Sequence, residues 1–115
     1  MNDINMKKEL QSQYKEREII GGVFIIKNTI TGKILLDSAA DLQSSKNRFE
    51  FAKKSGSCIN MKLQADWNTQ NGEHFVFEVL EELKKGETQT QAEFKADIAL
   101  LKTLWLEKLA DETLY

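Results

Sequence analysis

The chain has 115 residues, of which 41% are hydrophobic and 30% charged, with one Cys, one His and no Pro. A chain of this length buries roughly two-thirds of its unfolded surface, which is enough for one core without disulfide or metal staples. The lone Cys58 cannot form an internal disulfide and no signal-peptide pattern opens the chain, so we expect a cytoplasmic protein. Its apolar runs are far shorter than the ~20 residues of a membrane helix, so we expect no membrane contact.

The charge and the inventory of reactive side chains exclude several classes of site. The 16 basic and 18 acidic residues give a net charge of -2, which argues against a strong, general nucleic-acid footprint. One His and one Cys cannot build a zinc site, so we expect no metal site and no cofactor. The charge is uneven, because residues 41–62 carry a net +3 and residues 73–97 a net -4. The basic side chains of the middle segment are Lys46, Arg48, Lys53, Lys54 and Lys62.

The first predicted elements are a helix and a β-hairpin. Apolar side chains spaced by four or five positions predict an amphipathic helix over residues 1–20, which Gly21 and Gly22 would end. Residues 23–26 are β-branched and aromatic, as in a buried strand, and residues 33–37 read as a second strand. The intervening segment ends in Gly32 and is rich in turn formers, so the two strands should pair as an antiparallel hairpin.

Two helices should follow the hairpin. Ser38 or Asp41 can cap the first, and Gly56 suits its C-terminal end. The second requires Ile59 and Leu63 on one face and ends at residues 70–72. The inward residues of the first helix are predicted to be Leu42, Ser45, Phe49 and Ala52, and Trp67 completes the stripe of the second.

The last predicted elements are a strand and a helix. Residues 75–80 alternate so that Phe75, Phe77 and Val79 share one face. Residues 81–91 are polar, so we expect a loop or a frayed helix start there. The final helix has an apolar stripe made of Phe94, Ile98, Leu101 and Trp105, widened by Leu104 and Leu109.

The predicted order is therefore α-β-β-α-α-β-α. Three strands with mixed connections are too few for a doubly wound parallel sheet, so the fold class is α/β of the α+β kind. We expect a small three-stranded antiparallel sheet flanked by helices.

Residues 22–38, GVFIIKNTITGKILLDS, resemble the opening of GIY-YIG nuclease domains. In that family a strand bearing G-I-Y leads through a K-N turn and a G-K hairpin to a strand bearing Y-I-G. Segments 41–42, 62–72, 75–82 and 104–109 are similar to later parts of the family's domain. The resemblance implies a GIY-YIG-like domain over residues 21–110, preceded by the helix of residues 1–20 and followed by a tail of residues 111–115.

Members of that family cleave phosphodiesters with a phenol, a carboxylate that holds a divalent cation, and a guanidinium. The resemblance places Phe24 where the first Tyr is expected, and Leu35 opens the Leu-Leu-Asp that replaces Y-I-G. Ser45 occupies the position of the helix Arg, Phe49 that of a His, and Lys102 that of the metal-binding Glu. We therefore expect a degenerate site without catalytic residues, and a divalent cation only if nuclease activity remains.

Three functions stay open on this basis. The leading one is a catalytically inactive domain that binds nucleic acid weakly through the five basic side chains of residues 41–62. Five phosphate contacts predict a slope of log affinity against log salt of about -4.5, at about -0.9 per contact. A protein-interaction or scaffold module using the degenerate cleft or the N-terminal helix is the first alternative, which an accessible patch of Phe24, Leu35 and Phe49 would favour. A residual metal-dependent endonuclease is the second, in which Arg48 and a carboxylate, Asp37 or Glu107, would replace the missing groups.

Overall fold

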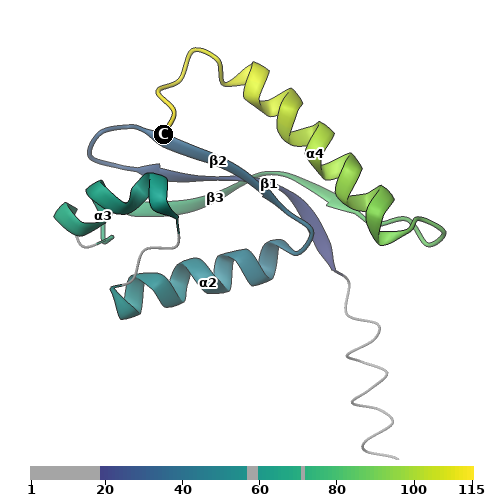
Figure 1. The fold of residues 1–115 in the computed structure, drawn as a ribbon, viewed down its shortest axis with the longest axis horizontal. Helices are drawn as coiled ribbons and strands as arrows, with labels where there is room; N and C mark the ends of the chain where they lie inside the picture. The colour runs from purple at the N-terminus through teal and green to yellow at the C-terminus, as the bar shows by residue number, and fades with distance from the viewer. Residues whose placement is uncertain (1–18, 57–59, 71) are drawn as a thin grey trace, which may run out of the picture.

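The computed structural model describes residues 19–56, 60–70 and 72–115 (Figure 1). The predicted N-terminal helix lies outside these residues up to position 18. From there on, the predicted order of strands and helices is confirmed. In chain order the elements are β1 (Ile20–Asn28), β2 (Ile34–Ala39), α2 (Leu42–Ser55), the 3-10 turn η1 (Met61–Leu63), α3 (Gln64–Gln70), β3 (Phe75–Lys84) and α4 (Gln91–Lys108).

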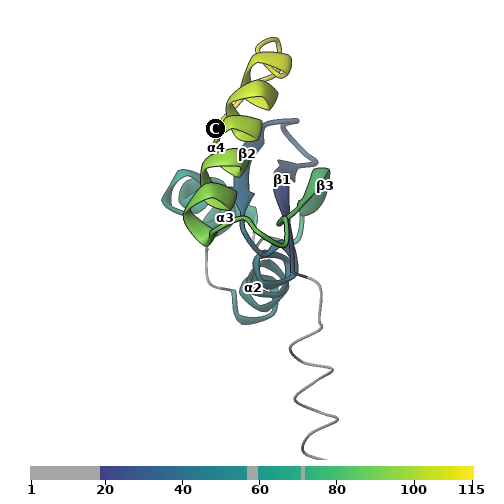
Figure 2. The ribbon, with the colours of Figure 1, turned by 90° about the vertical axis from the view of Figure 1, so that its right-hand side faces the viewer.

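The three strands form one antiparallel sheet in the order β2-β1-β3. Helix α4 covers one face of this sheet, and α2 and α3 cover the other (Figures 1 and 2). The predicted antiparallel sheet flanked by helices is therefore confirmed. Because β1 lies in the centre, β2 and β3 are both edge strands.

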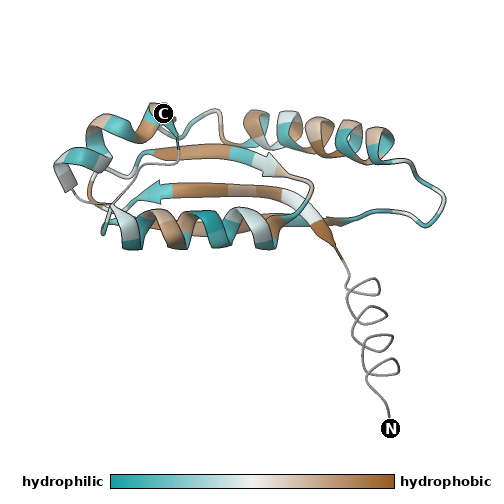
Figure 3. Cartoon of the chain, turned by 60° about the horizontal axis from the view of Figure 1, so that its bottom comes forward, coloured by the Kyte–Doolittle hydropathy of each residue, from teal (hydrophilic) through white to brown (hydrophobic). Residues whose placement is uncertain are grey.

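Alternation along β1 and β2 divides the core into two clusters. Odd and even side chains of a strand point to opposite faces, so neighbours in sequence enter different clusters. In Figure 3 the strands are largely hydrophobic, and the helices mix hydrophobic and hydrophilic residues. The cluster under α2 and α3 contains Phe24, Ile26, Leu35, Leu42, Phe49, Ala52, Leu63, Trp67 and Phe75. The cluster under α4 contains Val23, Ile25, Ile34 and Leu36, with Leu101, Trp105 and Leu109 packed against it.

Helix α2 begins and ends at the predicted residues. The Asp41 carboxylate accepts a hydrogen bond from the Ser44 backbone N–H at 3.3 Å and so caps the helix. Gly56 closes it in the left-handed conformation, with φ of 75°. The predicted inward stripe is confirmed, because the buried residues of α2 are Leu42, Ser45, Phe49 and Ala52.

The prediction that Gly21 and Gly22 end a helix is wrong, because both lie inside β1. A Cβ on Gly21 would lie 2.6 Å from Ile98 Cδ1, so the missing side chain lets α4 approach the strand. Gly22 has φ of +151°, and a Cβ there would overlap the Glu81 carbonyl oxygen of β3. The glycine pair therefore serves close packing between elements that are far apart in sequence.

Strand β3 continues to Lys84, so residues 81–84 of the predicted loop 81–91 belong to the strand instead. The pairing shifts between Val23 and Phe24, which are opposite Glu81 and Val79, so Leu80 is an extra residue on β3. Such a bulge lets adjacent side chains reach one face. Leu80 packs against the cluster under α4, and the Glu81 carboxylate accepts a hydrogen bond from Trp105 Nε1 at 2.9 Å.

Helix α4 starts with a capping box that the sequence prediction did not identify. The Thr90 hydroxyl accepts a bond from the Glu93 N–H at 3.1 Å, and the Glu93 carboxylate accepts one from the Thr90 N–H at 3.3 Å. The helix buries Phe94 and Ile98 as predicted. Leu104 does not widen the stripe, because 46% of it is exposed.

The C-terminal segment (residues 113–115) folds back onto β2. The Ile34 N–H donates to the Thr113 carbonyl at 3.0 Å, and the Tyr115 N–H donates to the Ile34 carbonyl at 2.9 Å. The Tyr115 hydroxyl donates to Asp66 Oδ2 at 2.7 Å and accepts from Asn28 Nδ2 at 3.0 Å. The segment thus joins the edge of the sheet to α3.

Candidate functional site

A pocket of about 240 Å³ lies between the β1–β2 hairpin and α2. Its apolar side chains come from the sheet face that α2 covers, and its polar side chains come from the end of β2, from α2 and from the residue before η1. The pocket therefore has one apolar part and one polar part. The lining residues are Phe24, Ile26, Leu35, Asp37, Ser38, Ser45, Arg48 and Asn60.

The hairpin register brings the strand residues of the pocket together. Phe24 pairs with Asp37, and Ile26 pairs with Leu35. Residues that are directly opposite one another, or two positions apart on one strand, share a sheet face. The Asp37 carboxylate is therefore placed directly across from the Phe24 ring, at the polar edge of an apolar surface.

Helix α2 contributes the buried Ser45 and the exposed Arg48. The two residues are three positions apart and hence one turn apart on the same side of the helix. Arg48 Nη2 donates to Ser45 Oγ at 3.4 Å. This bond leaves most of the guanidinium donors available at the pocket mouth.

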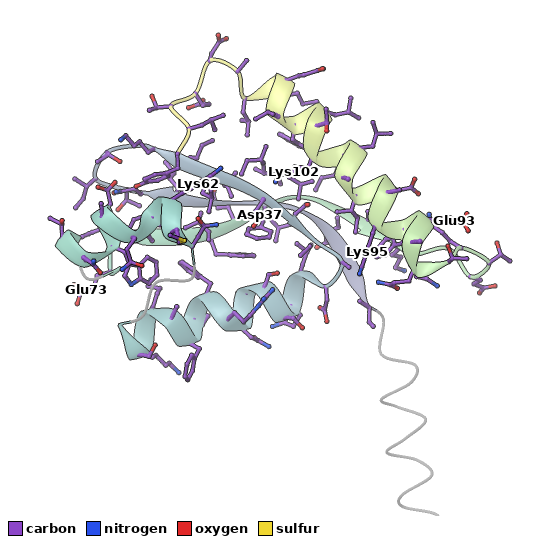
Figure 4. The ribbon with its side chains drawn as sticks, viewed as in Figure 1. Asp37, Lys62, Glu73, Glu93, Lys95 and Lys102 are labelled. Atoms are coloured by element: carbon purple, nitrogen blue, oxygen red, sulfur yellow. The ribbon has the colours of Figure 1, made fainter. Side chains whose placement is uncertain are left out.

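Lys102 on α4 forms an ion pair with Asp37, with Nζ 3.7 Å from Oδ1. Lys102 comes from α4 on one face of the sheet, whereas Asp37 lines the pocket on the other face. Figure 4 shows the two residues close together at β2. This contact is possible because β2 is an edge strand, so a long side chain can reach past it. Asp37 Oδ1 also accepts a hydrogen bond from the Ser38 N–H at 2.8 Å.

The pocket contains three of the five positions that the resemblance assigns to catalysis, namely Phe24, Leu35 and Ser45. Phe49 does not line it. Its ring packs in the core against Trp67, with ring centroids 6.2 Å apart. Lys102 does not line the pocket either, but it lies beside it through the Asp37 ion pair.

The five predicted nucleic-acid-binding residues are not brought together on one surface. Successive residues of a helix are rotated by about 100°, so Lys46 and Arg48 lie about 200° apart around α2. Arg48 faces the pocket, whereas Lys46 lines a second groove of about 350 Å³ that also contains Asp41 and Glu82. An anion would meet two carboxylates in that second groove.

The remaining three basic residues have different environments. Lys53 Nζ donates to the Phe75 carbonyl at 3.1 Å and is half-buried, so its charge is partly committed within the domain. Lys54 is exposed in the last turn of α2, and Lys62 is exposed in η1.

The resemblance to a nuclease raises the question of a divalent cation, and the pocket residues do not fit one. Asp37 is the only carboxylate among the described lining residues, and the Lys102 ammonium lies beside it. A hard divalent cation is held by oxygen ligands, and an ammonium beside the carboxylate weakens its binding by repulsion. Within residues 19–56, 60–70 and 72–115, no group of three or more His, Cys, Asp or Glu side chains is placed to hold a metal ion.

Sequence reasoning missed part of the pocket. Ile26 carries a usable signal, because it lies two residues after Phe24 and hence on the same strand face. Ser38 and Asn60 lie outside any periodic pattern, and the ion pair between Asp37 and Lys102 joins segments with no local relationship. None of the helices in the described part of the chain is long and apolar enough to cross a bilayer.

Comparison with known proteins identifies two solved structures with this fold. The catalytic domain of homing endonuclease I-TevI is 26% identical, with a TM-score of 0.57, over 78% of this chain and 88% of that domain. A mutant of the catalytic domain of intron endonuclease I-TevI is also 26% identical, with a TM-score of 0.59, over 80% and 86%.

No protein-family model and no curated protein matches the chain. The two structural matches nevertheless agree with the resemblance to this family's fold and with the observed sheet and helices. The chain is thus a GIY-YIG-like domain, with the three-stranded antiparallel sheet and helices of the I-TevI catalytic domain.

Proposed function

We propose that this GIY-YIG-like domain binds nucleic acid through its backbone phosphates and does not cleave it. The observation that carries this proposal is the composition of the pocket beside α2. Phe24, Leu35 and Ser45 lie there, at positions that the resemblance assigns to catalysis, while the Arg48 guanidinium remains at the mouth. The matches to endonuclease catalytic domains support nucleic acid as the kind of ligand.

The pocket positions that the resemblance assigns to catalysis lack the groups that phosphodiester cleavage needs. Attack by water requires a proton acceptor, and the Phe24 ring and the Leu35 side chain have none. The negative charge that develops on the phosphate requires a cation or a metal ion close to it. Ser45 is neutral, and the one pocket carboxylate, Asp37, is paired with an ammonium. The same surface still attracts a phosphate without activating it.

Arg48 is the best-placed phosphate contact. It is exposed, it faces the pocket, and a guanidinium can bind two phosphate oxygens at once. Lys54 and Lys62 are exposed and add longer-range attraction, whereas Lys53 is held by the Phe75 carbonyl. Since Lys46 lies on the opposite flank of α2, one strand of nucleic acid cannot contact all five side chains. We therefore expect a salt slope shallower than about -4.5.

The test is a salt titration of a labelled oligonucleotide, single-stranded and duplex, followed by fluorescence anisotropy. We expect Arg48→Ala to weaken binding and to reduce the slope by about 0.9, the value of one phosphate contact. Lys95→Ala is the matched control, because Lys95 is exposed on α4 and lies outside the pocket, and it should leave affinity and slope unchanged. Lack of binding at about 50 mM salt, or a slope of zero, would refute the proposal.

Residual endonuclease activity is tested separately. The protein is incubated with duplex and branched DNA in Mg²⁺ or Mn²⁺, and we expect no cleavage. Turnover that disappears in Arg48→Ala would mean that Arg48 supplies the missing guanidinium, and the domain would then be an enzyme.

A protein-docking role for the degenerate cleft has less support. Such a role needs an accessible apolar patch, but Phe24 and Leu35 are each 5% exposed and Phe49 is 2% exposed. The predicted N-terminal helix, the other candidate for protein binding, lies outside the described residues up to position 18.

A further inference from the structure

The strongest unassigned feature of the pocket is the charge pairing at Asp37. One carboxylate oxygen, Oδ1, accepts the Ser38 N–H at 2.8 Å and also faces Lys102 Nζ at 3.7 Å. The side chains of Asp37 and Lys102 are 44% and 42% exposed, so the pair lies at the surface where a ligand can reach it.

We propose that the Lys102 ammonium takes the electrostatic place of a divalent cation beside Asp37. The pocket would then hold a phosphate anion by Lys102 and Arg48 without any metal. The claim that Lys102 and Arg48 hold a phosphate rests on the proposed nucleic-acid binding. The claim that Lys102 takes the place of a divalent cation does not.

The local charge balance supports an anion. Arg48 and Lys102 provide two positive charges and Asp37 provides one negative charge, so the three side chains carry a net +1. A lysine ammonium acts as a point charge for phosphate, and a guanidinium adds directed hydrogen bonds. The Asp37 carboxylate holds the Lys102 ammonium at the edge of the pocket by charge attraction, as a carboxylate ligand holds a metal ion.

The same arrangement opposes a divalent cation. Mg²⁺ and Mn²⁺ are held by carboxylates together with water and substrate phosphate. Here the available carboxylate already has two partners on one oxygen, and a bound dication would lie within a few ångströms of the Lys102 ammonium. Like charges repel at this separation with little screening by salt.

The direct test replaces the ammonium by a carboxylate. Lys102→Glu places two carboxylates side by side at the pocket edge, and we expect it to bind Mn²⁺ at least about tenfold more tightly than the wild type. Mn²⁺ alone is the probe, measured by electron paramagnetic resonance of the free ion and by calorimetry. Lys95→Glu is the matched control, because it makes the same charge change two turns earlier on the same helix (Figure 4).

Oligonucleotide affinity provides the second readout. Wild-type affinity should be unchanged when Mg²⁺ is replaced by EDTA at constant ionic strength. Lys102→Glu should bind the oligonucleotide more weakly in EDTA and regain affinity in Mg²⁺, whereas Lys95→Glu should show no such recovery.

The possible results separate this inference from the proposed function. Equal Mn²⁺ affinity of wild type and Lys102→Glu, or a loss of wild-type oligonucleotide binding in EDTA, overturns the inference. If the wild type binds no oligonucleotide, the proposed function fails, while the Mn²⁺ titration still decides whether Lys102 excludes the cation. If Lys102→Glu does not fold, Lys102→Gln removes the repelling charge alone and should still raise Mn²⁺ affinity above wild type; equal affinity again overturns the inference.

Discussion

Asn28 Nδ2 donates a hydrogen bond to the Tyr115 hydroxyl at 3.0 Å, which links the turn of the first hairpin to the last residue of the sequence. Asn28 is fully buried, and its Oδ1 accepts the backbone N–H groups of Ile30 and Thr31 at 3.0 and 3.3 Å. One side chain therefore holds both the hairpin turn and the C-terminal segment (residues 113–115) in place.

Replacing Asn28 by Ala should destabilise the domain by about 1–3 kcal/mol for each buried polar group left without a partner. The free energy of unfolding is measured by urea denaturation. Asn68→Ala is the matched control, because among the described residues the Asn68 side chain accepts one exposed hydrogen bond, from Gln64. Its removal should change stability by less than about 0.5 kcal/mol. Equal effects of the two substitutions would contradict the role assigned to Asn28.

Tyr115 should make stability depend on pH in the alkaline range. Burial, and then the hydrogen bond to Asp66, raise the pKa of Tyr115 above its ordinary value of 10.0. The folded state therefore keeps the phenolic proton after the unfolded state has lost it. The stabilisation is complete below pH 10 and is lost as pH rises through the raised pKa.

The measurement compares urea denaturation of the wild type and Tyr115→Phe at about pH 9 and about pH 11. The stability advantage of the wild type should shrink at the higher pH, since Phe has no proton to lose. The difference cancels the titration of other groups shared by both proteins. A constant advantage across this range would argue against the bond between Tyr115 and Asp66.

Two neighbouring phenylalanines on α2 should respond very differently to truncation. Phe49 is 2% exposed and contacts Trp67 and Phe77, whereas Phe51 is 70% exposed. Phe49→Ala should cost about 3–5 kcal/mol of unfolding free energy, because it leaves a cavity in the core. Phe51→Ala should change stability by less than about 0.5 kcal/mol, and a large loss there would mean that the exposed ring is covered in solution.

Gly22 should not tolerate a side chain. Gly22→Ala forces a Cβ into the Glu81 carbonyl at a left-handed φ, and overpacking of this kind costs about 1–3 kcal/mol or more. Gly86→Ala is the control, because the nearest atom to its Cβ would be Gln89 Cβ at 3.6 Å, an ordinary contact. Thermal unfolding of both variants checks the prediction, and similar melting temperatures would contradict it.

Local patterns predicted the elements whose residues bury one continuous face. Helix α2 is the clearest example, since Leu42, Phe49 and Ala52 recur at helical spacing and the cap residues Asp41 and Gly56 bound them. The hairpin was also predictable, because β-branched strands flank a turn rich in polar residues and glycine.

Features that depend on distant partners could not be predicted in this way. Gly21 and Gly22 suggest a helix end locally, but their meaning comes from α4 and β3, which pack against them. The acidic second half of β3 reads as a loop because it lies at a sheet edge, where polar side chains face water. Leu104 is spaced as a member of the apolar stripe of α4, yet it is exposed, because the sheet is too narrow to cover the whole apolar side of this helix.

The candidate pocket was predictable only in part. The resemblance named Phe24, Leu35 and Ser45, and the hairpin register with α2 above it brings them together. The contact between Lys102 and Asp37 depends on the position of β2 at the sheet edge, which a one-dimensional pattern does not contain.

The pairing of residues 113–115 with Ile34 also has a consequence for the growing chain. During synthesis the β1–β2 hairpin leaves the ribosome long before Thr113 and Tyr115 do, so the outer edge of β2 has open backbone donors and acceptors at Ile34 until then. An unpaired edge is where nascent chains associate wrongly. Protection of this edge is therefore among the last events in the biogenesis of the domain, and a ribosome stalled before residue 113 would present a sheet that can still recruit another strand.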